Sequence, residues 1–290
     1  MMEKINTQRF RQKLKSYRRT PLSLFLFLLV TVSAVITVFV LFLLIAYILI
    51  KGIPHLTPEL FSWTYNSENV SMLPSIINTI LMTLLSLLIA TPLGIFSAIY
   101  LVEYAKRGNK VVNVIRVTAE TLSGIPSIVY GLFGMLFFVV TLHWNRSLLS
   151  GAATLAIMIL PLIMRTTEEA LKSVPDTYRE GSFGLGAGRL RTVFRIVLPS
   201  ATPGILAGVI LAIGRIVGET AALIFTAGTV PNLPESVFDS TRTLALHMYI
   251  LSQEALYFDQ AYATAVVLLV VVIGINSLSN FIAKKIAKGS

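Results

Sequence analysis

Arg215 and Glu219 are the only charged residues in a long apolar stretch, residues 203–227. Placing a charge near the centre of a membrane helix costs from about 2.5 to more than 10 kcal/mol, depending on the reference state. Their four-residue spacing puts both side chains on one helical face, where they can pair. Intramembrane charges commonly mark a translocation path, and a planar guanidinium suits a tetrahedral oxyanion. We therefore expect Arg215 to receive an anion and Glu219 to hold Arg215 between transport events.

The same stretch also supports a structural alternative, in which the charged pair only locks neighbouring helices together. Two pairs of glycines at four-residue spacing, Gly204 with Gly208 and Gly214 with Gly218, predict close helix packing. Replacing a buried ion pair by apolar residues is often neutral or stabilising, so stability alone is a weak reason to keep one. The functional interpretation of Arg215 is therefore the favoured one.

A second group of polar residues lies in residues 165–202, the longest polar stretch between apolar spans. Thr177 and Glu180 have the spacing of a capping box, which predicts that a helix starts at Thr177. Three glycines within residues 184–188 would end this helix, because glycine lowers helix stability and permits left-handed turns. The expected element is a short helix held at the membrane surface.

Membrane helices are the elements that must position both groups. Of the 290 residues, 55% are hydrophobic and 13% are charged, whereas a soluble domain has about 25% charged residues. This excludes a large cytosolic enzyme, and the lack of cysteine excludes disulfides and thiolate metal sites. No strand pattern is visible, so the predicted fold class is all-α. The predicted transmembrane spans are residues 22–50, 75–101, 121–142, 150–164, 203–227 and 261–283.

The positive charges predict the topology of these six spans. The net charge is +10, and 20 of the 24 Lys and Arg residues fall in residues 1–21, 102–120, 165–202 and 284–290. Cytoplasmic loops carry such an excess, so both termini are expected in the cytoplasm of a multi-pass protein of the cell membrane. Residues 1–21 directly precede a span, which favours contact with the lipid bilayer over a nucleic-acid partner.

The polar loop carries a resemblance to a known family. Glu180-Gly181-Ser182, followed by Gly186 and by Ile196-Val197-Leu198-Pro199, resembles the cytoplasmic "EAA" loop of ABC-importer permease subunits, with small residues in place of the two alanines. In that family the loop forms a coupling helix that docks on a separate ATPase subunit. The resemblance therefore assigns ATPase docking to Thr177, Tyr178, Arg179, Glu180, Gly181, Ser182 and Gly186.

Two further segments, Gly214–Ala221 and Gly124–Gly134, resemble the phosphate branch of these permeases. The resemblance covers about residues 72–283 and implies the type I importer fold and a role in phosphate import. It also implies three kinds of partner: a second homologous permease subunit, a cytoplasmic ATPase dimer and an extracytoplasmic phosphate-binding protein. No nucleotide-binding motif is present, so we expect no enzyme activity, cofactor or metal in this chain.

The expected organisation has four parts. A basic cytoplasmic segment (1–21) precedes the first helix with a short extracytoplasmic segment (22–71), the permease core (72–283) and a cytoplasmic tail (284–290). The short outer segment favours the A-type over the C-type phosphate permease subunit. Four alternatives remain: the C-type subunit, a permease for another oxyanion, an ion-coupled secondary transporter and a polytopic membrane enzyme.

Overall fold

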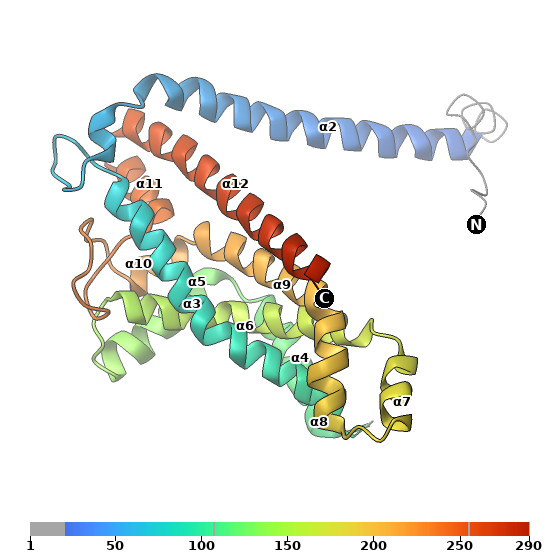
Figure 1. The fold of residues 1–290 in the computed structure, drawn as a ribbon. Coiled ribbons are helices and arrows are strands. Elements are labelled where there is room, and N and C mark those ends of the chain that lie inside the picture. The colour runs from blue at the N-terminus through green and yellow to red at the C-terminus, as the bar shows by residue number, and fades with distance from the viewer. Residues whose placement is uncertain (1–20, 107, 255, 290) are drawn as a thin grey trace. The chain divides into compact units, whose positions relative to one another are not determined.

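The computed structural model is helical (Figure 1) and describes residues 21–106, 108–254 and 256–289. These ranges contain no strand, so the predicted all-α class is confirmed. Contacts divide the chain into two units, residues 1–51 and residues 52–290, and each unit is described by itself.

The helices of the chain range from a single turn to 32 residues in length. The α-helices are α2 (Pro21–Gly52), α3 (Leu73–Ile99), α4 (Lys110–Ser123), α5 (Ser127–Gly134), α6 (Leu148–Lys172), α7 (Asp176–Gly184), α8 (Arg189–Thr192), α9 (Leu198–Val217), α10 (Ala221–Thr226), α11 (Leu244–Gln253) and α12 (Phe258–Gly289). The 3-10 turns are η1 (Ile53–His55) and η2 (Pro58–Phe61), and the π-helical turns are η3 (Tyr100–Tyr104), η4 (Met135–Thr141) and η5 (Val193–Val197).

Helix α2 forms nearly all of the described part of the first unit. Its 32 residues correspond to about 48 Å at 1.5 Å per residue, which exceeds the hydrocarbon thickness of about 30 Å. The large apolar side chains along its length are mostly exposed. A helix of this length and composition suits a lipid environment, in agreement with the predicted first span.

Helix α6 is the central element of the second unit. It packs against α3 and α9, and the three helices share a core that contains Met82, Ile159 and Ile216. Helix α3 approaches α6 so closely at Gly94 that an added Cβ would lie 2.8 Å from the side chain of Ile163. This close packing joins α3 and α6 through the core of the unit.

Among the residues that the structure describes, five helices are long and apolar enough to cross a membrane, and a bent pair supplies a sixth crossing if it counts as one. The bent pair is Lys110–Ser123 with Ser127–Thr141, which meet at 104°. The third span was predicted at residues 121–142, but residues 121–123 belong to the preceding helix. Pro126 lies at the bend, and the residue before a proline is biased away from the α conformation.

The fourth and fifth spans were predicted with wrong boundaries. Helix α6 starts at Leu148 and continues through Pro161 to Lys172, well beyond the predicted 150–164. The fifth span was predicted at 203–227, whereas the observed helix runs over Arg189–Val217. Three arginines lie near the start of this helix and lower its hydropathy. A prediction based on hydropathy therefore places the start of the span too late. The helix ends before Gly218, and a separate short helix, α10, follows.

Helix α3 links the two ends of the second unit (Figure 1). Its first turns contact α11, where the Leu244 backbone N–H donates to Thr79 Oγ1 at 2.8 Å. Its other end continues into η3, where Glu103 contacts Arg179 of α7. The stretch from Thr79 to Glu103 separates these two contacts by about 36 Å along the helix.

Candidate functional site

Helix α7 is the short surface helix that the polar loop predicted. It begins at Asp176 with Pro175 as its N-cap, and no side chain caps it. The predicted capping box of Thr177 and Glu180 is therefore wrong. Pro175 sets this start because its fixed φ suits the entry to a helix, and Asp176 places a carboxylate near the positive helix end.

The predicted glycine stop of α7 is confirmed. Gly186 has φ +83°, a left-handed conformation that glycine adopts without strain. The Ala187 N–H donates to the Ser182 carbonyl at 3.1 Å, and the Gly186 N–H donates to the Phe183 carbonyl at 2.9 Å. These two bonds form a Schellman motif, which satisfies the last helix carbonyls and turns the chain toward α8.

The residues of α7 divide into an outward and an inward group. Thr177, Tyr178, Glu180 and Gly181 are exposed. Ser182 is buried, and its hydroxyl lies 2.8 Å from that of Thr192. Three exposed apolar residues near the outward group were missed by the sequence analysis: Phe183, Leu185 and Leu190. The signal available in the sequence was that these apolar residues lie within the polar stretch 165–202.

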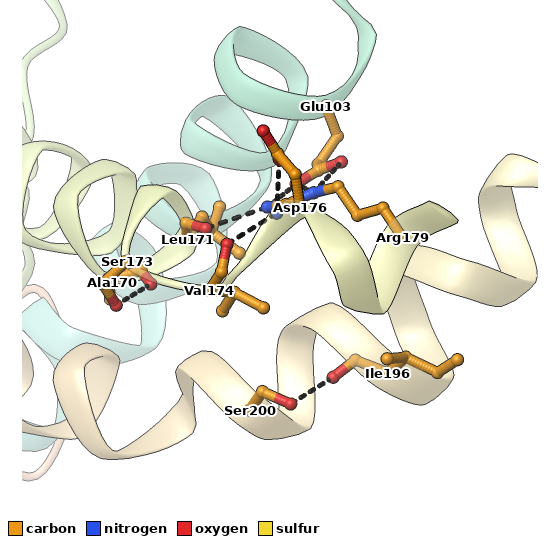
Figure 2. Close-up of polar contacts among 9 residues, drawn as sticks. All are labelled: Glu103, Ala170, Leu171, Ser173, Val174, Asp176, Arg179, Ile196 and Ser200. Carbon is orange, nitrogen blue, oxygen red and sulfur yellow. Dashed lines mark hydrogen bonds and ion pairs between the residues drawn. The ribbon is translucent and has the colours of Figure 1, made fainter. Parts of the chain in front are cut away.

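Arg179 points inward, away from the face where docking was expected (Figure 2). Its Nη2 lies 2.7 Å from Glu103 Oε1, and both side chains are largely buried, at 13% and 9% exposure. Nη2 also donates to the Leu171 carbonyl at 2.9 Å, and Nη1 donates to the Val174 carbonyl at 2.8 Å. Arg179 is therefore an anchor in this structure and offers little surface to a partner.

This anchor joins three elements. Glu103 belongs to η3 at the end of α3, Leu171 to the last turn of α6, and Arg179 to α7. A cation at the carboxyl end of a helix satisfies its free carbonyls and is favoured by the helix dipole. A displacement of α7 must therefore move the ends of α3 and α6, or break a buried ion pair.

Arg215 and Glu219 do not form the pair that their spacing predicted. Arg215 lies in the last turn of α9, and Glu219 lies beyond the helix end, in the break before α10. Glu219 is 9% exposed, and its Oε1 accepts from the Ala222 N–H at 3.1 Å. No ion pair joins the two residues. The helix break at Gly218 is the reason, because it destroys the face that an i, i+4 pair requires.

Arg215 lines a hollow of about 550 Å³ between α4, α6 and α9. The hollow carries four cations and three carboxylates, and most of these charges are paired. Glu168 pairs with Arg116 at 2.7 Å and Lys172 at 2.6 Å, and Arg165 pairs with Glu169 at 3.2 Å. Among the described residues, Arg215 is the cation of this hollow that has no carboxylate partner.

The four glycines of α9 and its end fall into two groups. An added Cβ at Gly204 would lie 2.6 Å from Ala170 Cβ, and one at Gly208 would collide with the Thr166 hydroxyl. Both glycines therefore allow α9 to pack closely on α6. Gly214 and Gly218 have no atom of another helix closer than 3.9 Å, so the predicted close packing is absent there within the described chain.

A protein-family model matches most of the chain. The model of the "Binding-protein-dependent transport system inner membrane component" matches residues 90–289. A probable ABC transporter permease of Bacillus subtilis, YqgI, is 35% identical over 264 residues, covering 84% of this chain and 89% of its own. The phosphate transport system permease protein PstA of Mycobacterium leprae is 32% identical over 224 residues, covering 74% and 73%.

The fold itself also has solved counterparts. A chain of a bacterial alginate ABC transporter, solved in complex with an alginate-pentasaccharide-bound periplasmic protein, superposes with a TM-score of 0.70. The alignment covers 94% of this chain and 98% of that one at 15% identity. At this identity the likeness concerns the fold alone, and it agrees with the predicted type I importer architecture.

Proposed function

Because the chain belongs to the inner-membrane components of binding-protein-dependent transport systems, we propose that it is a permease subunit of an ATP-driven phosphate importer. The similarity to a phosphate permease over 74% of the chain supports phosphate as the substrate. The A-type subunit is the favoured assignment. Family membership argues against a secondary transporter that works alone and against a membrane enzyme.

The proposed complex has three further components: a second homologous permease subunit, a cytoplasmic ATPase dimer and an extracytoplasmic phosphate-binding protein. The solved alginate transporter supports a binding protein on the outer side, since its chain shares this fold and was solved with a periplasmic protein. The excess of Lys and Arg in residues 1–21 and 165–202 supports cytoplasmic termini and a cytoplasmic α7.

Arg215 is the proposed anion contact of this half of the pathway. The other cations of the hollow are held by carboxylates, and its four cations exceed its three carboxylates, which leaves positive potential where an anion would pass. Its fork of N–H donors suits two oxygens of a phosphate. Glu219 accepts a hydrogen bond from the backbone of α10 and would stabilise the break between α9 and α10.

Helix α7 is the proposed contact with the ATPase. Its exposed residues Tyr178 and Glu180, with the apolar Phe183 and Leu185, form an amphipathic surface that suits a groove on a partner. Arg179 would then transmit a displacement of α7 to α3 and α6 through the Glu103 pair. Closure of the ATPase dimer on ATP binding would thereby reopen the bundle outward.

The function is tested in cells that lack their own phosphate importers. The chain is expressed with a candidate ATPase, sister permease and binding protein from the same genome. Uptake of radiolabelled phosphate is measured with and without excess sulfate, and uptake of radiolabelled sulfate is measured in parallel. We expect ATP-dependent uptake that sulfate does not inhibit. Uptake of sulfate in place of phosphate would contradict the substrate, and failure of any ATPase to co-purify would contradict the importer role.

Changing Glu180 to lysine is expected to detach the ATPase. Glu180 is exposed on α7, so the substitution reverses a charge on the docking surface without disturbing the packing of the permease. Co-purified ATPase should fall at least about tenfold, which corresponds to a loss of about 1.4 kcal/mol. The exposed Arg191 of α8, changed to glutamine, is the control and should retain the ATPase. Normal association of the Glu180 variant would refute the docking role.

A further inference from the structure

Arg242 is a buried arginine at the end of the second unit that lies away from α7. It precedes α11 and is 4% exposed. It forms no ion pair with a carboxylate of the described chain. The Tyr65 side chain forms a hydrogen bond with it, and the charge of Glu254 acts on it without an ion pair. An arginine stays protonated in proteins, and a buried charge without a counter-ion is costly. The surroundings must therefore supply negative charge.

The free donors of Arg242 lie on one edge of the guanidinium. Nε and Nη2 both lack a hydrogen-bond partner in the described structure. These two N–H groups point in parallel, which is the arrangement that binds two oxygens of an oxyanion. The Tyr65 ring covers a face of the guanidinium, 4.7 Å from its carbon to the ring centroid. The ring thus stacks on the face of the guanidinium and does not occupy its Nε–Nη2 edge.

His247 adds an uncharged polar group to this cluster. Its imidazole is fully buried and packs edge-on against Tyr65, with ring centroids 6.2 Å apart. Burial, and after it the charge of Arg242, together lower the pKa of His247 to about 3, although a hydrogen bond with the Val70 backbone partly opposes them. The ring is therefore neutral at ordinary pH, and it contributes an N–H donor but no second positive charge.

Further unpaired polar groups lie next to Arg242 in sequence and on α3. The buried hydroxyls of Thr241 and Thr243, and the side-chain oxygen of Asn78 on α3, have no hydrogen-bond partner in the described chain. The Asn78 amide donates to the Arg242 carbonyl at 3.4 Å, which joins the segment before α11 to α3.

We propose that the Nε–Nη2 edge of Arg242 binds one inorganic tetrahedral oxyanion. At 4% exposure, the arginine is too enclosed for a carboxylate side chain of a partner protein to reach it, whereas a small free ion can be enclosed with it. The Thr241, Thr243 and His247 donors supply the remaining hydrogen bonds. This site lies at the opposite end of α3 from Glu103 and is separate from Arg215. The inference does not require phosphate to be the transported substrate.

Thermal unfolding tests the site in the full-length chain, purified with its native partners. Phosphate or sulfate is titrated into a gluconate buffer, and the unfolding midpoint is followed. We expect the midpoint to rise to a plateau, since a ligand that binds the folded state stabilises it. Arg242→Gln should weaken the apparent affinity at least about tenfold, while Arg146→Gln, a change at an exposed arginine, should not. An equal response in all three proteins would overturn the proposal.

A second measurement needs no variant, in case Arg242→Gln fails to fold. Crystals of the native protein are soaked in selenate, a tetrahedral oxyanion whose selenium is located by anomalous scattering. We expect a selenium peak within hydrogen-bond reach of Arg242 Nε and Nη2. Selenium peaks elsewhere without one at Arg242, or water alone at the guanidinium edge, would overturn the assignment.

Discussion

Arg215→Gln is expected to abolish phosphate uptake while the transport complex still assembles. Glutamine keeps a polar side chain but removes the charge and the guanidinium fork that would hold the anion. The other cations of the hollow are held in ion pairs with Glu168 and Glu169, so they cannot replace it. We expect uptake to fall by about 30-fold or more, the equivalent of about 2 kcal/mol of lost charge-assisted binding. Uptake of labelled phosphate measures the change.

The controls separate an anion contact from a structural arginine. Arg215→Lys keeps the charge without the fork, so it should retain part of the transport. The amount of co-purified ATPase and sister permease should equal that of the unchanged protein in both variants, because Arg215 has no ion-pair partner in the described chain. A dissociated complex in Arg215→Gln would instead show that this arginine holds helices together.

Arg179→Gln is expected to uncouple ATP hydrolysis from transport. The change leaves Glu103 buried without its partner, and breaking a buried ion pair costs about 3–5 kcal/mol. The exposed face of α7 keeps Tyr178 and Glu180, so the ATPase should still bind. The variant should show a lower unfolding midpoint and at least about a tenfold fall in phosphate transported per ATP hydrolysed. Both are measured on the complex in lipid vesicles.

Two comparisons decide whether Arg179 transmits the motion of α7 or only stabilises the folded protein. Glu103→Gln removes the same pair from the other side, 76 residues away in sequence, and should reproduce the uncoupling. Arg191→Gln, at an exposed position on the neighbouring α8, should change neither the midpoint nor the coupling ratio. A lower midpoint with a normal coupling ratio in both pair variants would show that the bond only stabilises the fold.

Helix boundaries show where sequence reasoning reaches its limit. The first span was placed within two residues at each end because α2 is apolar all along its length. The fifth span was misplaced because Arg189, Arg191 and Arg195 lower the hydropathy of a segment that is still helical. The hydrophobicity of a segment indicates whether it faces lipid or water, whereas the positions of helix ends depend on local hydrogen bonds and backbone conformation. The break at Gly218, which separates Arg215 from Glu219, is such an end.

The sequence by itself determined the helical class, the membrane location, the short surface helix in residues 165–202 and the family. These follow from local patterns: apolar runs, glycine stops and motif spacing. Only the tertiary structure decided that Arg179 faces inward, that Arg215 lines a hollow without an ion-pair partner and that Arg242 is buried with two unpaired donors. Each of these depends on residues distant in sequence, such as Glu103 for Arg179. Spacing along one helix shows which side chains share a face, but the neighbour that meets that face is set by how the helices pack.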